Sequence, residues 1–323
     1  MNILILSAGT RVQLVRFFKK TNGINQVITV DCSKYAPALY EGSLYYIVPK
    51  MNEEAYIPSI LTICEKNNIN VILPLQENEL ELMAEVKEIF EKKGISVVIS
   101  PIETIRLCRD KYKLARYMDK QGIRCVPTFK YNIDKKQIEN ISFPVLIKQQ
   151  YGAGSIGMLK ADCMELLDAY NRSVGRNLIV QPYLEAKEFG VDVYVDMISG
   201  EIINIFIKKK IRMRAGETEK SVSVKDPKLF EFIKKIVNVT TLRGPIDMDI
   251  FLNQGNYMLL EINPRFGGGY PHAYQCGIDF MKYIIKNVQG DRNIPEIGCY
   301  EEGKVFLKYT DAIMVDEDKE KMN

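Results

Sequence analysis

Short apolar runs alternate with amphipathic stretches through the first part of the chain. The apolar runs have the length of buried strands and cover residues 2–6, 27–30, 71–73 and 96–99. The stretches between them carry apolar residues at helical spacing and cover residues 11–20, 56–66 and 79–93. Strands and helices alternate in this way when crossover helices join parallel strands, so the pattern predicts an α/β, Rossmann-like domain over residues 1–99.

Three loops of this expected domain follow the carboxyl ends of strands, which is where parallel sheets bind their ligands. They are residues 7–11, 31–33 and 74–78. We place the end of the domain at Ser100, because Ser100, Pro101 and Glu103 form the pattern of a helix start with Ser100 as the capping residue.

Beyond residue 100 the pattern changes to a small α/β lobe followed by longer strands. In the small lobe we expect helices over residues 110–120 and 165–171 and strands over residues 144–148 and 178–181. From Phe189 onward, long runs joined by tight turns such as Ser199-Gly200 predict a larger antiparallel lobe. The expected units are residues 100–185 for the small lobe, 186–290 for the large lobe, and 291–323 for a C-terminal tail with one strand near 305–309.

Composition narrows the class of partner and the compartment. The net charge of +3 is small, which argues against a nucleic acid or an acidic membrane as partner. The apolar run at the N-terminus is too short for a signal-peptide core, and no stretch has the length of a transmembrane helix. The seven cysteines are scattered without a C-x-x-C pair, which favours reduced thiols in the cytoplasm over disulfides or a zinc site. We interpret the lysines at residues 208–210 as a solvated face or as neighbours of a phosphate.

The most informative segment is Leu-Glu-Ile-Asn-Pro-Arg at residues 260–265. Strand side chains alternate between faces, so Glu261 and Asn263 should point the same way. Asp249 lies on the preceding apolar run, and the residues between the two runs suit a turn. If the register places Asp249 beside Glu261, two carboxylates and an amide offer the oxygen ligands that Mg²⁺ takes, and Arg265 adds a fork for a phosphate or carboxylate. The alternative is a surface hairpin with solvated acids.

Two further segments suit a nucleotide. The glycine-rich residues 152–157 follow the strand that carries Lys148, and glycine N–H groups can close around phosphate oxygens within reach of this ammonium. A plain hairpin explains the same glycines. Pro182 should end regular pairing, which would free its carbonyl and the N–H of Leu184 for an adenine edge. Glu188 could accept hydrogen bonds from ribose hydroxyls.

Taken in order along the chain, these features resemble the ATP-grasp superfamily, above all the carbamoyl-phosphate synthase large chain and small proteins related to it. The likeness covers roughly residues 100–290, and residues 1–99 look like the N-terminal sheet domain that precedes the ATP-grasp domain in this family. The resemblance therefore implies a two-lobed α+β ATP-grasp domain behind the parallel-sheet domain. Residues 149–151 depart from the family pattern, which often has a proline after the second lysine.

The resemblance also implies roles for individual residues. The phosphate-binding positions would be Lys111, Lys148, Gly152, Gly154, Ser155 and Gly157. Those for adenine and ribose would be Gln181, Pro182, Leu184 and Glu188. The ligands of two Mg²⁺ ions, or of Mn²⁺ in their place, would be Asp249, Glu261 and Asn263. Arg265 and Lys148 would be catalytic residues at the transferring phosphoryl group. Residues that match a flexible loop near the γ-phosphate are Arg212, Arg214 and Glu217.

The implied activity is ATP-dependent ligation of a small carboxylate to an amine or another nucleophile through an acyl phosphate, in a chain that can form a homodimer. One alternative is a nucleotide-binding regulator that keeps the fold without ligation. Another is an NAD(P)-binding enzyme, since Gly9 follows a strand and Asp31 lies where a ribose acid would, although the later glycines of that motif are missing. The single histidine, His272, follows the glycines 267–269 in a loop expected to face the substrate, and its role stays open.

Overall fold

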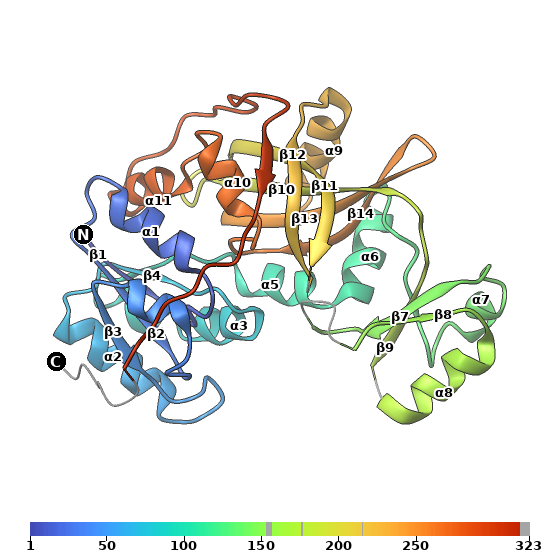
Figure 1. Ribbon diagram of the computed structural model, residues 1–323, viewed down its shortest axis with the longest axis horizontal. Coiled ribbons are helices and arrows are strands. Elements are labelled where there is room, and N and C mark those ends of the chain that lie inside the picture. Colours follow the sequence, from blue (N-terminus) through green and yellow to red (C-terminus); the bar gives the residue numbers. More distant parts are fainter. Residues whose placement is uncertain (153–156, 176, 215, 317–323) are drawn as a thin grey trace.

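The computed structural model describes the chain except for residues 153–156, 176, 215 and 317–323. Its described residues form three sheets in chain order, with five strands, four strands and six strands (Figure 1). The parallel sheet and the long antiparallel sheet lie in the main body, and the four-stranded sheet forms an arm at one end (Figure 1). The expected parallel-sheet domain followed by a two-lobed α+β domain is confirmed.

The first sheet is parallel and has the order β3-β2-β1-β4-β5. Its strands are β1 (Asn2–Ile5), β2 (Gln26–Asp31), β3 (Leu44–Ile47), β4 (Val71–Leu73) and β5 (Ser96–Val97). The helices around it are α1 (Val12–Lys20), η1 (Pro37–Glu41), α2 (Tyr56–Lys66), α3 (Glu77–Glu85) and α4 (Lys87–Glu91). Strand β3 was not expected, because it is an edge strand whose side chains are only half buried and so gives little hydrophobic contrast.

The connection to the second domain is a helix pair, α5 (Ile102–Arg109) and α6 (Lys111–Lys120). The carboxylate of Asp110 caps α6 by accepting the N–H of Lys113 at 3.0 Å. The expectation that Ser100 caps α5 is wrong, because Pro101 holds the N-cap position. The hydroxyl of Ser100 instead donates to the carbonyl of Arg243 at 3.0 Å and accepts its N–H at 2.9 Å, which ties the connection to the large lobe.

The small lobe is an antiparallel sheet with the order β6-β9-β7-β8 and a core of its own. Its strands are β6 (Phe129–Lys130), β7 (Val145–Gln149), β8 (Leu159–Ala161) and β9 (Leu178–Pro182). Its helices are α7 (Lys135–Glu139) and α8 (Met164–Val174). The sheet carries Lys148 near the end of β7, next to the glycine-rich segment.

The large antiparallel sheet has the order β14-β13-β10-β11-β12-β15. Its strands are β10 (Lys187–Val195), β11 (Ile202–Arg214), β12 (Glu217–Ser223), β13 (Gly244–Asn253), β14 (Asn256–Asn263) and β15 (Val305–Leu307). One face is apolar and packs on α5, α6 and α9 (Pro227–Asn238). On the other face, Tyr194 and Phe206 share a core with α1 and with α10 (Tyr270–Gln275) and α11 (Phe280–Val288). The remainder of that second face carries charged side chains and forms the site.

Candidate active site

The hairpin of β13 and β14 brings acidic and amide side chains together on one face of the large sheet. Asp249 pairs with Glu261, the register on which the expected site depends, and Asp247 pairs with Asn263. The turn has Gln254 and a glycine at φ 47° and 78°, as a tight two-residue hairpin turn requires. The amide of Asn263 donates to Asp247 Oδ2 at 3.3 Å and to Glu261 Oε1 at 3.5 Å.

Asp247 is a member of this cluster that the sequence reasoning missed. It lies two residues before Asp249 on β13, so both carboxylates point to the same face while Ile246, Met248 and Ile250 are buried on the other. The strict alternation of apolar and acidic residues along this strand was the signal that could have found it. The cluster therefore holds three carboxylates and one amide.

Lysines from β11 lie beneath this cluster. Lys210 Nζ is 2.6 Å from Asp249 Oδ1 and 2.7 Å from Glu188 Oε1, with only 5% of its side chain exposed. Lys208 is buried and pairs with Asp192. The interpretation of residues 208–210 as a solvated face is therefore wrong for these two lysines, which lie in the sheet's charged interior.

Burial and like charge dominate the electrostatics of the cluster. Burial raises the pKa of Asp249. The negative charges of Asp247 and Glu261 raise it further, and the positive charge of Lys210 lowers it. Burial lowers the pKa of Lys148, which Glu261 opposes across the space between the lobes. In the described part of the chain, no three histidine, cysteine or acidic side chains converge on a point as a ready-made metal cage. The donors instead suit a cation that takes few protein ligands and completes its shell with phosphate and water.

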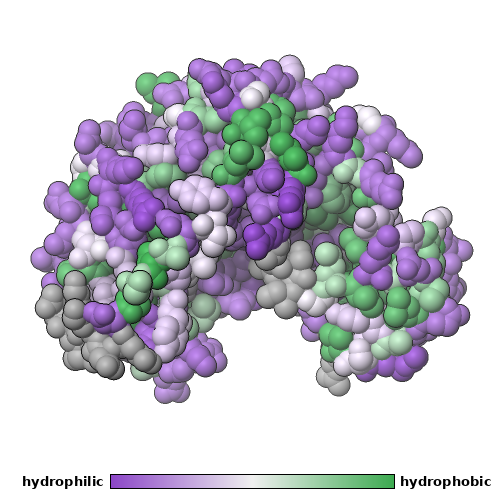
Figure 2. Space-filling model, in the orientation of Figure 1, coloured by the Kyte–Doolittle hydropathy of each residue, from purple (hydrophilic) through white to green (hydrophobic). Residues whose placement is uncertain are grey.

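A cavity of about 400 Å³ lies between the small lobe and the large sheet. Figure 2 shows the molecule hollowed between the small lobe and the rest of the body. We call this space the nucleotide cavity, after the ligand that the resemblance in the sequence implies for it. The expected site residues that line it are Lys111, Lys148, Gly152, Gln181, Pro182, Leu184, Glu188, Asp249 and Glu261. Strand β9 ends at Pro182, as the proline predicted.

The other residues of the glycine-rich segment that were expected to bind phosphate are Gly154, Ser155 and Gly157. Gly157 does not line the cavity; its carbonyl accepts a hydrogen bond from the hydroxyl of Tyr170 at 2.5 Å. Gly154 and Ser155 lie outside the described residues. Lys111, which on its own pattern would be an exposed helix residue, instead donates from Nζ to the carbonyl of Gly152 at 2.5 Å and lines the cavity wall.

A second cavity, of about 590 Å³, adjoins the first. We call it the substrate cavity, because loops at the ends of parallel strands, where ligands are expected, form part of its wall. It is lined by residues 7–11 and 75–78 of the first domain and by Asp247, Asn263 and Arg265 of the large lobe. The residues that line both cavities are Gly152, Met213, Gly216, Asp249 and Glu261. The acidic cluster therefore lies where the nucleotide cavity and the substrate cavity meet.

Two arginines face the substrate cavity, each beside carboxylates. Arg265 Nη1 is 3.4 Å from Asp247 Oδ2, and its Nη2 is 3.5 Å from Glu77 Oε1. Arg11 Nη1 is 3.3 Å from Glu217 Oε1. The other residues of the expected γ-phosphate loop, Arg212 and Arg214, are exposed and pair with Glu219 instead. Of the three side chains expected at that loop, Glu217 is the one that lines the cavity.

The glycines at residues 267–269 are there for close approach rather than for flexibility. A methyl group at Gly267 would overlap the carboxylate of Asp247. At Gly268 it would lie 2.6 Å from Arg11 Nη1, and at Gly269 2.8 Å from Lys208 Cε. The backbone of this loop therefore packs directly on the charged side chains of the site.

His272 lies behind this loop and lines none of the cavities described here. Its Nδ1 is 2.8 Å from the hydroxyl of Ser221, its Nε2 is 3.1 Å from the carbonyl of Lys304, and its ring stacks on Phe306. Burial lowers the pKa of His272 to about 4, so the ring is neutral and donates from Nε2. These contacts fix the ring in the packing behind the glycine loop.

Asp31, the acid on which the NAD(P)-binding alternative depends, is engaged by the chain's own backbone. Asp31 accepts the N–H of Gly9 at 2.9 Å and the N–H of Ser33 at 2.9 Å, so its carboxylate closes the chain's own loops. This use of Asp31 argues against the NAD(P)-binding alternative.

A cavity between a small antiparallel lobe and a long antiparallel sheet, with an Asp–Glu–Asn set at its edge, defines the ATP-grasp fold. Residues 175–303 match the family model "ATP-grasp in the biosynthetic pathway with Ter operon", and residues 3–98 match "PylC-like, N-terminal domain". These two segments of the chain are similar to an ATP-grasp domain and to a PylC-like N-terminal domain, and the first similarity agrees with the resemblance seen in the sequence.

Individual relatives agree with this placement. The carbamoyl phosphate synthase large chain of Thermotoga neapolitana is 26% identical over 226 residues, which is 64% of this chain and 20% of that protein. The chain thus spans about a fifth of the length of that relative. Among solved structures, the biotin carboxylase of Campylobacter jejuni superposes with a TM-score of 0.75 at 19% identity, over 94% of this chain and 74% of its own. The N5-carboxyaminoimidazole synthetase of Staphylococcus aureus, complexed with ADP, gives 0.72 at 18% identity, over 95% and 79%.

None of the helices within the described residues is both long enough and apolar enough to cross a membrane.

Proposed function

We propose that this chain is an ATP-dependent ligase that joins a small carboxylate to an amine through an acyl phosphate. The observation that carries the proposal is the junction of two cavities at Asp249 and Glu261. A nucleotide in one cavity and a carboxylate in the other would meet at this junction, where phosphoryl transfer needs charge stabilisation. The similar proteins reported above are named as a synthase, a carboxylase and a synthetase, which supports an activity of this class.

The nucleotide cavity suits ATP from end to end. Lys111 and Lys148 are the cations at the phosphate end, and the backbone of Pro182 and Leu184 lies at the end that would take the adenine edge. Glu188 would accept the ribose hydroxyls, although in this structure it also pairs with Lys210. Gln181 is buried and donates to the hydroxyl of Thr128 at 2.8 Å, so it would support the adenine end from behind.

Mg²⁺ fits the acidic cluster. Burial raises the pKa of Asp249, and the neighbouring carboxylates Asp247 and Glu261 raise it further; a divalent cation at this place would offset both effects. Asp249, Glu261 and Asn263 would hold the metal, either two Mg²⁺ ions or Mn²⁺ in their place. When bound, the metal supplies neutralisation of the charge on the phosphates.

The chain's own residues would bind and orient the reactants. The substrate carboxylate attacks the γ-phosphorus, ADP departs, and an acyl phosphate remains beside Arg265. The amine then attacks the acyl carbon, the C–N bond forms, and the bond from carbon to the phosphate oxygen breaks. Arg265 and Lys148 would stabilise charge on the transferring group, and no side chain acts as a nucleophile.

Other parts of the proposal concern partners and place. The reactants would be small molecules, without a nucleic acid partner, and the chain would work as a homodimer. The cysteines of the described residues are all free, which supports a reducing compartment and hence the cytoplasm. A regulator that binds ATP without ligation would need fewer metal-binding side chains than this cluster supplies.

The test is a screen of carboxylic acids with Mg²⁺-ATP and hydroxylamine, which traps an acyl phosphate as a hydroxamate. Acid-dependent ADP release with hydroxamate formation supports the ligase. Tight ATP binding without ADP release for any acid, amine or pair would favour the regulator instead. Asp249→Asn should abolish the hydroxamate, and Glu85→Gln, an exposed acid on α3, should not.

A further inference from the structure

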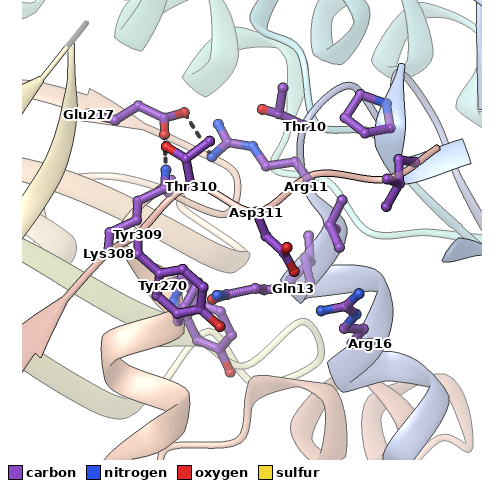
Figure 3. A pocket seen from close by; sticks show the side chains of 17 residues that line it. Thr10, Arg11, Gln13, Arg16, Glu217, Tyr270, Lys308, Tyr309, Thr310 and Asp311 are labelled. Atoms are coloured by element: carbon purple, nitrogen blue, oxygen red, sulfur yellow. Dashed lines mark hydrogen bonds and ion pairs between the residues drawn. The ribbon is translucent and has the colours of Figure 1, made fainter. Parts of the chain in front are cut away.

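A third cavity, of about 290 Å³, lies between the start of α1 and the segment that follows β15 (Figure 3). Residues 308–313 cross in front of α1 and form one wall, and residues 267–271 form another. The proposed ligase reaction leaves this third cavity without a role. It is nevertheless continuous with the site, because Thr10, Arg11, Glu217 and Gly268 line both it and the substrate cavity.

The junction between these two cavities is charged. Glu217 pairs with Arg11 at 3.3 Å and also with Lys308, so two cations share one carboxylate (Figure 3). A guanidinium has five N–H donors, and the contact to Glu217 is the one side-chain bond that Arg11 makes within the described residues. Arg11 is therefore equipped to bind a second carboxylate, one that belongs to a ligand.

The rest of the third cavity is mostly apolar. Its lining includes three cations and two acids, and the apolar lining residues are Val12, Leu14, Pro37, Tyr270, Pro271, Tyr309 and Ile313. An excess of positive charge at the mouth and apolar walls beyond it suit a small anion with an apolar body.

We propose that the amine substrate is an α-amino acid, whose carboxylate binds Arg11 and whose apolar side chain occupies the third cavity. This inference rests on the proposed ligase function. On an α-amino acid the carboxylate, the amine and the side chain diverge from one carbon. A carboxylate held at the junction therefore leaves the side chain in the third cavity and the amine in the substrate cavity, where the acyl phosphate forms.

The step that follows is a simple acyl transfer. The neutral amine attacks the carbonyl carbon, the new C–N bond forms, and the bond to the phosphate oxygen breaks. Phosphate leaves with the electron pair and takes up a proton from the amine. The product is an amide that retains the carboxylate of the incoming amino acid, so Arg11 holds the same group before and after the reaction.

The test compares phenylalanine with phenethylamine, which lacks only the carboxylate, as acceptors for an acid identified by the hydroxylamine screen. The kcat/KM of the full-length chain should favour phenylalanine by about 10- to 100-fold, the range of a charge-assisted hydrogen bond. Arg11→Gln should reduce this ratio to within about threefold. Hydroxamate formation is measured in parallel for Arg11→Gln, because hydroxylamine carries no carboxylate and reports the first half-reaction alone.

Arg106→Gln is the matched control, because Arg106 also pairs with carboxylates but lies on α5 outside the cavities. Its preference for phenylalanine should equal that of the unaltered chain. An unchanged preference in Arg11→Gln, with hydroxamate still formed, would overturn the inference and leave the ligase intact. Absence of hydroxamate with every acid would overturn both.

A second variant keeps the inference testable if Arg11→Gln does not fold. Ile313 lies on the wall formed by the C-terminal segment and is half exposed. Ile313→Ala should lower kcat/KM for phenylalanine about three- to tenfold relative to alanine as acceptor, since it removes apolar contact with the larger side chain. An unchanged ratio would place the side chain elsewhere and overturn the inference.

Discussion

The nucleotide cavity and the substrate cavity share an acidic edge but are assembled differently. The nucleotide cavity is lined by residues between positions 111 and 261, mostly from successive strands and from the segment that begins at Pro182. The substrate cavity combines loops of the first domain with the glycine loop at residues 267–269. The first can be recognised from local patterns, whereas the second exists only once distant segments have packed together.

The two cavities also differ in whether their cationic side chains are paired with carboxylates. Among the described residues, Lys111 and Lys148 of the nucleotide cavity form no ion pair with a carboxylate, as expected of cations meant for phosphates. In the substrate cavity, Arg11 and Arg265 are each held beside acidic side chains at 3.3 to 3.5 Å. The nucleotide cavity is thus poised for a strongly anionic ligand, and the substrate cavity for one that competes with internal carboxylates.

The shared acidic edge should be the most sensitive position. Glu261→Gln keeps the shape of the side chain but removes its charge, so ADP formation should fall about 1000-fold or more, because both cavities depend on this carboxylate. Steady-state ADP release measures the effect, with Glu85→Gln as the control. Activity within tenfold of the unaltered chain would mean that the cavities do not meet in catalysis.

Arg265 separates the cavities more finely, because it lines the substrate cavity alone. Arg265→Lys keeps the charge but loses the guanidinium fork, so kcat should fall about 10- to 100-fold. The KM for ATP should stay within threefold. A rise in the KM for ATP at constant kcat would instead assign Arg265 to nucleotide binding.

Gly267→Ala tests the close approach of the glycine loop. The added methyl group must displace the carboxylate of Asp247, so the KM for the carboxylate substrate should rise about tenfold while ATP binding changes little. Gly303→Ala, at an exposed glycine with φ 80° and open space around it, controls for general destabilisation. Equal effects of the two variants on KM would show that the loop does not shape the site.

His272 should have the smallest effect on either cavity. Its folded pKa of about 4 lies below the ordinary 6.5, so the stability it contributes is present above pH 6.5 and is lost as the pH falls toward 4. Denaturant unfolding across this range should show His272→Asn with a shallower loss of stability, by on the order of 3 kcal/mol at most. At pH 7.5 its kcat should remain within twofold; a larger loss would give the histidine a chemical role.

Much of the fold follows from local pattern. The parallel sheet follows from hydrophobic periodicity. The register of Asp249 with Glu261, which the expected site required, agrees with the turn chemistry between the two strands. The edge strand β3 was missed because half-buried strands have little contrast. The burial of Lys208 was missed because lysine is usually exposed, and its partner Asp192 lies on another strand.

The residues of the site also differ in whether a local sequence pattern predicts them. Residues that line the nucleotide cavity follow strands whose spacing is visible in the sequence, and the resemblance to a known family supplied their roles. The contact of Arg11 with Glu217 joins residues more than two hundred positions apart, and no local pattern encodes such a pair. Asp247 is the exception, because its alternation with apolar neighbours could have been read.

The separate apolar cores of the molecule indicate which part can move relative to the rest. Phe18 of the first domain packs edge-on against Phe266, within one core that also includes Tyr194 and Phe206 of the long sheet. The first domain and the long sheet are therefore held together by one shared core. The small lobe, which contains β6 to β9, has a separate core. We therefore expect this lobe to be the part that moves when a nucleotide binds.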